Sequence, residues 1–102
     1  LAWDGQLHAL AAEWASHLAD SRRFHHRDLQ SVLHAPGWES YWSLGENILV
    51  GPSGIDGDQM QDAWLRSPTH RANIMGAYDS IGIAIAYGSD GYVRAVENFG
   101  RH

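Results

Sequence analysis

The segment from Ile81 to Tyr87 constrains the fold more than any other part of the sequence. Isoleucine and tyrosine alternate there with glycine and alanine, which predicts a strand with one bulky face and one small face. The small face would let a helix approach the sheet closely. Turn residues follow in GSDG, and Tyr92 to Phe99 continues as a second strand. We therefore expect an antiparallel hairpin at the end of the chain.

A helix is predicted at the beginning of the chain, and an irregular segment after it. Between Trp3 and Ala19 apolar residues recur every three or four positions, as in an amphipathic helix. The stretch from Asp20 to Leu44 follows neither the helical nor the strand period, so we expect a structured loop. The helical stripe consists of Trp3, Leu7, Leu10, Ala11, Trp14 and Leu18.

The middle of the chain is typical of a short strand followed by two helices. GENILVG, residues 45 to 51, predicts a strand with Glu46, Ile48 and Val50 on one side. Asp56 or Asp58 can cap the next helix, and Pro68 ends it and begins another. Helices on either side of a small, mainly antiparallel sheet make this an α+β fold.

Composition narrows the class of protein. The 102 residues suit one compact domain, and the absence of cysteine means that packing alone must stabilise it. A formal net charge of -5 argues against nucleic acid as a partner. No apolar run reaches the roughly 20 residues that span a bilayer. Since the chain does not start with methionine, we expect Leu1 to be a cut inside a longer protein.

Two side chains outside the apolar pattern stand out as candidates for chemistry. His70 falls in the first turn of a predicted helix, where the helix dipole favours a neutral imidazole that can bind a metal. Equally, His70 can be a hydrogen-bonded histidine at the corner between two helices. Glu46 can face a site, or it can simply accept amide hydrogen bonds from a loop. Spacing alone leaves both alternatives open.

Short catalytic and metal motifs are absent from the sequence. There is no HExxH, no zinc-finger spacing, no GxSxG elbow, no P-loop and no GxGxxG. Cysteine nucleophiles are excluded, and the available serines have simpler roles in turns and caps. His26, Glu46 and His70 are far apart along the chain, and no periodicity brings them together.

Four stretches in order resemble one known family. FHHRDL, GENILVG, WLRSPTHRANIM and YDSIGIAIAYG are similar to segments of the CAP superfamily, which comprises the cysteine-rich secretory protein, antigen 5 and pathogenesis-related 1 proteins, in its bacterial SCP-like form. The resemblance implies an α-β-α sandwich, usually secreted or held at the cell envelope. It also implies a shallow cleft in which two histidines and two glutamates can hold a divalent metal. Those positions fall here on His26, Glu46 and His70.

Two departures from the family pattern matter for function. The second glutamate has no clear match, because Arg66 and Ser67 stand where it is expected; Asp62 and Glu97 are imperfect substitutes. The family's usual first helix is also missing before LAWDG, residues 1 to 5. We therefore predict one domain over residues 1–102, truncated at its N-terminus, with apolar surface near the hairpin left uncovered unless an upstream segment or a partner covers it.

Three functions are compatible with this sequence. The first is an extracellular or cell-envelope binding module, whose cleft of His26, Glu46 and His70 meets a lipid, a glycan or a protein. The alternative is a metal-dependent hydrolase, in which His26 and His70 hold zinc and Glu46 takes a proton from the bound water. The third is a purely structural domain. No cofactor other than such a metal is indicated, and the oligomeric state is not specified.

Overall fold

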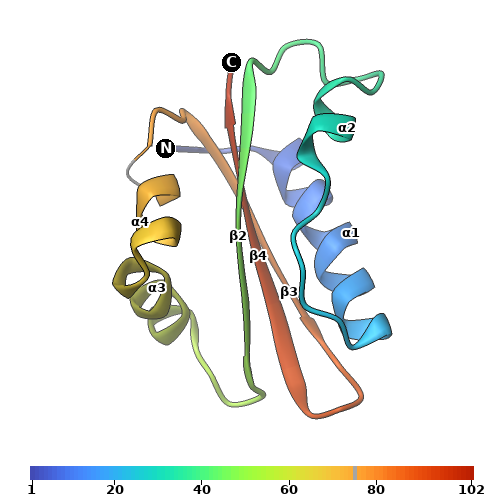
Figure 1. Ribbon diagram of the computed structural model, residues 1–102, viewed down its shortest axis with the longest axis vertical. Helices are drawn as coiled ribbons and strands as arrows, with labels where there is room; N and C mark the ends of the chain where they lie inside the picture. The colour runs from blue at the N-terminus through green and yellow to red at the C-terminus, as the bar shows by residue number, and fades with distance from the viewer. Residues whose placement is uncertain (75) are drawn as a thin grey trace.

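The computed structural model describes residues 1–74 and 76–102. Helices and strands follow one another in a mixed order along the chain (Figure 1). In sequence these elements are β1 (Ala2–Trp3), α1 (Gly5–Ser21), α2 (Leu29–Leu33), β2 (Ser43–Pro52), α3 (Gly57–Arg66), α4 (Pro68–Ile74), β3 (Ser80–Tyr87) and β4 (Tyr92–Arg101).

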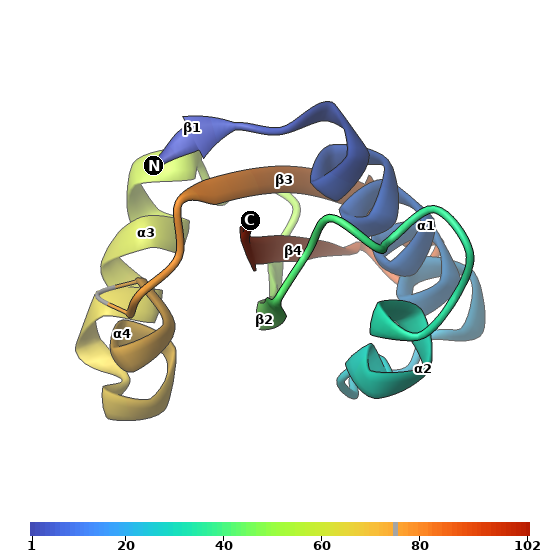
Figure 2. The ribbon, with the colours of Figure 1, turned by 90° about the horizontal axis from the view of Figure 1, so that it is seen from above.

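A mixed sheet separates two layers of helices. Within the described residues its strand order is β1-β3-β4-β2, so β2 is an edge strand and β4 a central one. β1 runs parallel to β3, and the other neighbours are antiparallel. Helices α1 and α2 lie on one side of the sheet, and α3 and α4 on the other (Figure 2). The predicted α+β class, an α-β-α sandwich around a mainly antiparallel sheet, is confirmed.

The helix α1 begins at Gly5 and not at Trp3 as the apolar stripe predicts. The carboxylate of Asp4 accepts hydrogen bonds from two backbone amides of the first turn, at 2.8 and 3.2 Å, and so caps the helix. Trp3 belongs instead to β1, where it is paired with Ile81 of β3. The prediction was wrong here because the spacing of Trp3 fits the helical period by chance, whereas an N-cap residue has extended backbone.

A second correction concerns the segment between residues 20 and 44, which was expected to lack regular structure. It contains α2, a helix of five residues. The side chain of Asp28 caps it by accepting from the backbone amide of Ser31 at 3.3 Å, and Val32 turns inward. A helix of this length completes little more than one turn, so it leaves no repeating apolar pattern in the sequence.

The small face of β3 receives α1, as the alternation predicts. A Cβ atom added at Gly82 would overlap the backbone of Leu7 and His8, so only glycine permits this approach. Ala84 continues the same face and is buried. The resulting core cluster joins α1 to three strands and consists of Ala11, Ala15, Leu18, Ile48, Ala84 and Val96.

On the opposite side of the sheet, α3 forms a second core. Asp56 and Gln59 make reciprocal hydrogen bonds with the backbone, a capping box that begins the helix at Gly57. The indole N–H of Trp64 donates to the carbonyl of Ile48 at 3.1 Å and so fixes the helix on β2. The buried members of this cluster are Met60, Trp64, Val93 and Ala95.

β3 and the neighbouring strand β1 carry apolar side chains that are only partly covered. Trp3 is 61% exposed, Ile85 is 44% exposed and Tyr87 is 73% exposed. Exposed apolar surface near Trp3 and the hairpin was expected from the missing first helix, and the exposure itself is confirmed. That an upstream segment or a partner covers this face stays a prediction.

Candidate functional site

His26 and Glu46 are in direct contact although 20 residues separate them in sequence. His26 lies in the segment that leads into α2, and Glu46 lies on β2. The imidazole Nδ1 is 3.1 Å from Glu46 Oε1. Because a carboxylate only accepts hydrogen bonds, Nδ1 of His26 is the donor in this contact. The His26 side chain is 58% exposed, whereas that of Glu46 is 1% exposed.

Three donors hold the buried carboxylate of Glu46 in place. Oε1 also accepts the backbone N–H of Arg27 at 3.0 Å, and Oε2 accepts the side-chain amide of Asn98 at 3.0 Å. Asn98 is the partner of Glu46 in the β2–β4 register, so both side chains lie on the same face. Glu46 thus accepts a hydrogen bond from a backbone amide of a loop and orients His26 at the same time.

His70 approaches from the other side of the edge strand. It lies on α4, and its backbone carbonyl accepts a hydrogen bond from the side-chain amide of Asn47 at 3.1 Å. Partial burial, together with the positive charge of His26, holds the pKa of His70 below its usual value. A neutral imidazole on α4 is therefore within electrostatic reach of His26.

Glu97 forms a separate, buried acidic position beneath α4. It is 1% exposed, and it faces Asn47 across the β2–β4 register. The Asn47 amide donates to Glu97 Oε1 at 3.1 Å as well as to the carbonyl of His70. Burial raises the pKa of Glu97 to about 7, even though the hydrogen bond from Asn47 lowers it. Glu97 is thus joined to the His70 backbone through one amide group.

The side chains of His26, Glu46 and His70 do not by themselves complete a metal site. Both oxygens of Glu46 accept N–H groups, so this carboxylate acts as a partner to His26. Across residues 1–74 and 76–102, no group of three or more His, Asp or Glu side chains is arranged to hold a metal ion. Zinc sites take three or four protein ligands. In the described region the imidazoles of His26 and His70 supply two, which is fewer than such a site needs.

Sequence reasoning overlooked two asparagines that organise this region. Asn47 and Asn98 are completely buried in strands, where asparagine is uncommon. Their polar character inside apolar strands was a usable signal, but their partners depend on strand register. Of the two substitutes considered for a second glutamate, Asp62 lies exposed on α3, and Glu97 is buried beside Asn47.

The remaining aromatic and histidine candidates have different surroundings. Trp42 is 80% exposed, whereas Trp38 is half-buried and its ring lies 4.9 Å from that of Tyr41. The histidines predicted to have no direct role make local contacts: His8 with the carbonyl of Ile83, His17 with the Trp14 ring, His34 with the carbonyl of Gln30, and His102 with Asp79.

Comparison with known proteins identifies the family. The model of the cysteine-rich secretory protein family, CAP, matches residues 1–99. The chain belongs to the CAP family. An outer surface protein from Borrelia burgdorferi has a similar structure, with a TM-score of 0.85 and 25% sequence identity; the match covers 100% of this chain and 77% of that one. No curated protein matches the sequence.

The CAP assignment agrees with the resemblance seen in the four sequence segments, and the matched structure shares the α-β-α arrangement. Among the helices of the described residues, none is long and apolar enough to cross a membrane.

Proposed function

We propose that this CAP domain is an extracellular or cell-envelope interaction module whose binding surface contains His26, Glu46 and His70. Family membership supports an interaction role, and the outer surface protein from Borrelia burgdorferi supports a location at the cell surface. The partner is a lipid, a glycan or a protein of the envelope.

The observation that carries this proposal is the fixed orientation of an exposed imidazole. The Glu46 carboxylate is buried and anchored by the Arg27 amide and by Asn98, so it holds the His26 ring from below. His70 adds a second imidazole that burial keeps neutral. A polar group whose position is already set loses little entropy on binding, which favours recognition of a partner.

A metal-dependent hydrolase finds less support. Its mechanism needs a bound water held by metal beside a free carboxylate base. In the described residues Glu46 is already engaged by three N–H groups, and two imidazoles alone do not make a zinc centre.

The proposal can be tested by binding assays with three probes. Phosphatidylglycerol vesicles, soluble peptidoglycan fragments and detergent-solubilised envelope proteins represent the three partner classes. Asparagine replaces histidine at both positions in the variant H26N/H70N. We expect the wild-type chain to bind one class, and the double variant to bind it at least tenfold more weakly.

A matched control separates the site from a general loss of histidine. His34→Asn removes an exposed ring whose contact among the described residues is with the carbonyl of Gln30, and it should leave binding unchanged. Equal binding by wild type and the double variant would contradict the proposed surface. Protease treatment of intact cells that carry the full-length protein tests its location, since a protein inside the cell would stay uncleaved.

A further inference from the structure

The strand β3 has an open edge along its second half. On that side its neighbour is β1, which is only two residues long and is paired with Ser80 and Ile81. The chain leaves the edge at Asp4, which caps α1. Figure 1 shows the β3–β4 hairpin extending past the ends of the helices. Among the described strands, β4 alone is therefore hydrogen-bonded to β3 from Ile83 to Tyr87.

The backbone groups of Ile85 and Tyr87 point outward from this edge. The amide of Gly88 donates to the carbonyl of Tyr92 at 2.8 Å, which sets the alternation of the β3–β4 ladder. Even-numbered residues of β3 then bond to β4, and odd-numbered residues face the edge. The Ile81 carbonyl agrees, because it accepts from a backbone amide on the β1 side at 2.9 Å. Within the part of the chain that the structure describes, the N–H and C=O groups of Ile85 and Tyr87 have no backbone partner.

The sequence of β3 does not protect these groups from another strand. Native edge strands usually carry charged residues, proline or a bulge that prevents pairing between molecules. SIGIAIAY, residues 80 to 87, contains neither a charge nor a proline, and its register with β4 runs without interruption. The carbonyl of Ile83 is already engaged, because His8 Nδ1 contacts it at 2.8 Å. The open stretch is therefore short and begins after Ile83.

The opposite edge of the sheet is better protected. The Trp64 indole donates to the carbonyl of Ile48 on β2, and β2 ends in Pro52. The proposed interaction surface also lies beside β2. A further strand therefore fits the β3 edge and not the β2 edge.

We propose that a second copy of this chain pairs with the open edge of β3, antiparallel and with Ala86 on the two-fold axis. Ile85 of each copy then lies opposite Tyr87 of the other copy, and their outward N–H and C=O groups bond to one another. The side chains of Ile85 and Tyr87, which are 44% and 73% exposed, meet on the same face of the continuous sheet. This pairing buries no charge and leaves the Ile83 carbonyl to His8.

A second copy suits this edge better than an unrelated extended segment. A two-fold pairing uses the same edge in both molecules, so it closes and leaves no part of the β3 edge for growth. It also matches an exposed aromatic residue with an exposed β-branched one, a combination that stabilises neighbouring strands. Because few residues pair, the interface falls below about 1,200 Å², the range of weak association. We therefore expect a dimer with a Kd on the order of 0.1 to 1 mM.

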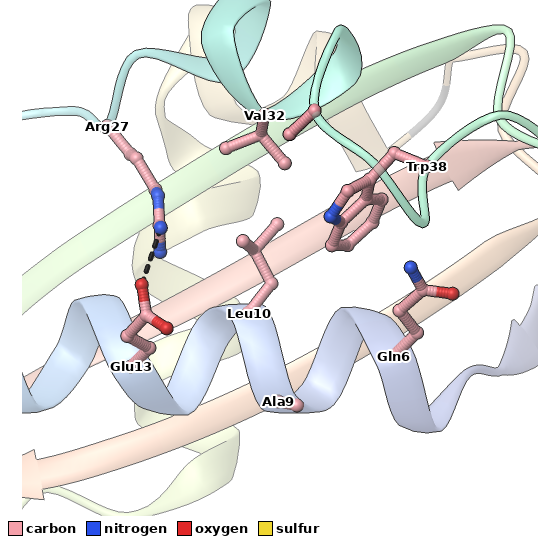
Figure 3. Close-up of a pocket in the computed structure, with 8 residues that line it drawn as sticks. Gln6, Ala9, Leu10, Glu13, Arg27, Val32 and Trp38 are labelled. Atoms are coloured by element: carbon pink, nitrogen blue, oxygen red, sulfur yellow. Dashed lines mark hydrogen bonds and ion pairs between the residues drawn. The ribbon is translucent and has the colours of Figure 1, made fainter.

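The inference goes beyond the proposed function and does not depend on it. Since β2 and β3 lie on opposite sides of the sheet, the dimer leaves the His26 surface of each copy free at its two ends. The hollow between α1 and α2 also stays uncovered, since Leu10 of α1 faces Val32 there, whereas His8 reaches the edge of β3 (Figure 3).

Sedimentation equilibrium of the wild-type chain up to millimolar concentration tests the proposal. We expect a reversible equilibrium between monomer and dimer. Ile85→Lys places a charge at the edge and should raise the Kd at least tenfold. Val50→Lys makes the same kind of change at a residue of similar exposure, 39%, on β2, and it should leave the Kd unchanged. A wild-type chain that stays monomeric, oligomers larger than a dimer, or equal weakening by the two variants would overturn the proposal.

A cross-link tests the register. The chain has no cysteine, so Ala86→Cys supplies one thiol in each copy. Residues that face each other without hydrogen bonds have Cα atoms about 4.5 Å apart, within the range of about 4.4 to 6.8 Å that a disulfide spans. Mild oxidation should therefore link Ala86→Cys chains into dimers several-fold faster than Val50→Cys chains. Equal rates would contradict the register.

Circular dichroism shows whether Ile85→Lys folds. If it does not, NMR of a mixture of isotope-labelled and unlabelled wild-type chains gives the answer. We expect nuclear Overhauser effects between the Ile85 methyl groups of one copy and the Tyr87 ring of the other. Contacts between copies that arise only from other surfaces would exclude the β3 edge.

Discussion

Glu97 makes the stability of this domain depend on pH near neutrality. Its ordinary pKa is 4.5, and burial raises it to about 7 in the folded chain. Between these two values the unfolded chain loses a proton that the folded chain keeps. The stability that Glu97 contributes is therefore fully present below about pH 4.5 and is lost as the pH rises through about 7.

The size of this effect follows from the two pKa values. A difference of about 2.5 pH units corresponds to about 3 kcal/mol once Glu97 is ionised in both states, and about 2.5 kcal/mol of it falls between pH 5 and pH 8. In a domain of about 100 residues, 1 kcal/mol shifts the thermal midpoint by roughly 4 to 8 °C. The wild-type midpoint should therefore carry a penalty of roughly 10 to 20 °C at pH 8 relative to pH 5.

Glu97→Gln is the variant that isolates this contribution. Glutamine keeps the oxygen that accepts from Asn47 and has no charge to bury. Thermal unfolding is followed by circular dichroism at pH 5, 6, 7 and 8. The thermal midpoint of the variant should rise relative to that of the wild type at each step in pH. His70 acts in the opposite direction, because its lowered pKa removes stability as the pH falls, but this contribution is present in both chains and cancels.

Asp79 and Asp90 do not disturb the comparison. Their pKa values are held at about 2, so both stay ionised throughout the assay. If the two chains keep a constant difference in midpoint from pH 5 to pH 8, Glu97 does not bury a charge near neutrality and the reasoning fails.

Further predictions concern packing, capping and metal binding. Gly82→Ala should lower the free energy of unfolding by about 1 to 3 kcal/mol in urea denaturation, because the new Cβ overlaps the α1 backbone. An unchanged urea midpoint would mean that α1 does not approach β3 so closely. Asp56→Ala should cost about 1 kcal/mol by the same assay through loss of the α3 cap, whereas Asp62→Ala on the exposed side of α3 should cost almost nothing. Zinc calorimetry should show binding no tighter than about 1 μM, which corresponds to about 8 kcal/mol; tighter binding that His70→Ala abolishes would show that a further ligand completes the site.

The parts of the fold that sequence predicted are those determined by neighbours along the chain. The alternation of Ile81 to Tyr87 and a helix cap at Asp56 or Asp58 are local patterns with a local physical cause. The structure contains the strand and has Asp56 as the cap. Trp3 shows the limit of periodicity: its spacing suits the helix, but Asp4 ends the extended segment one residue later. The helix α2 is too short for any period to reveal it.

The candidate site could be predicted only by resemblance, because its contacts join distant segments. His26 meets Glu46 across 20 residues, and Asn98 meets Glu46 across 52. These contacts exist because the β2–β4 register places Glu46 opposite Asn98, and no local pattern encodes a register.

The order Glu46 then Asn47 places two sets of polar contacts on the two faces of β2, an edge strand beside which His26 and His70 come within electrostatic reach of each other. Successive strand residues point in opposite directions, so Glu46 serves His26 on the α2 side while Asn47 serves His70 and Glu97 on the α4 side. A shift of β2 by a single residue would turn each side chain to the other face of the sheet. The contact of Glu46 with His26 and that of Asn47 with His70 would be lost together. The β2–β4 register therefore determines both sets of contacts at once. A sequence change that alters the register for Glu46 also alters it for Asn47.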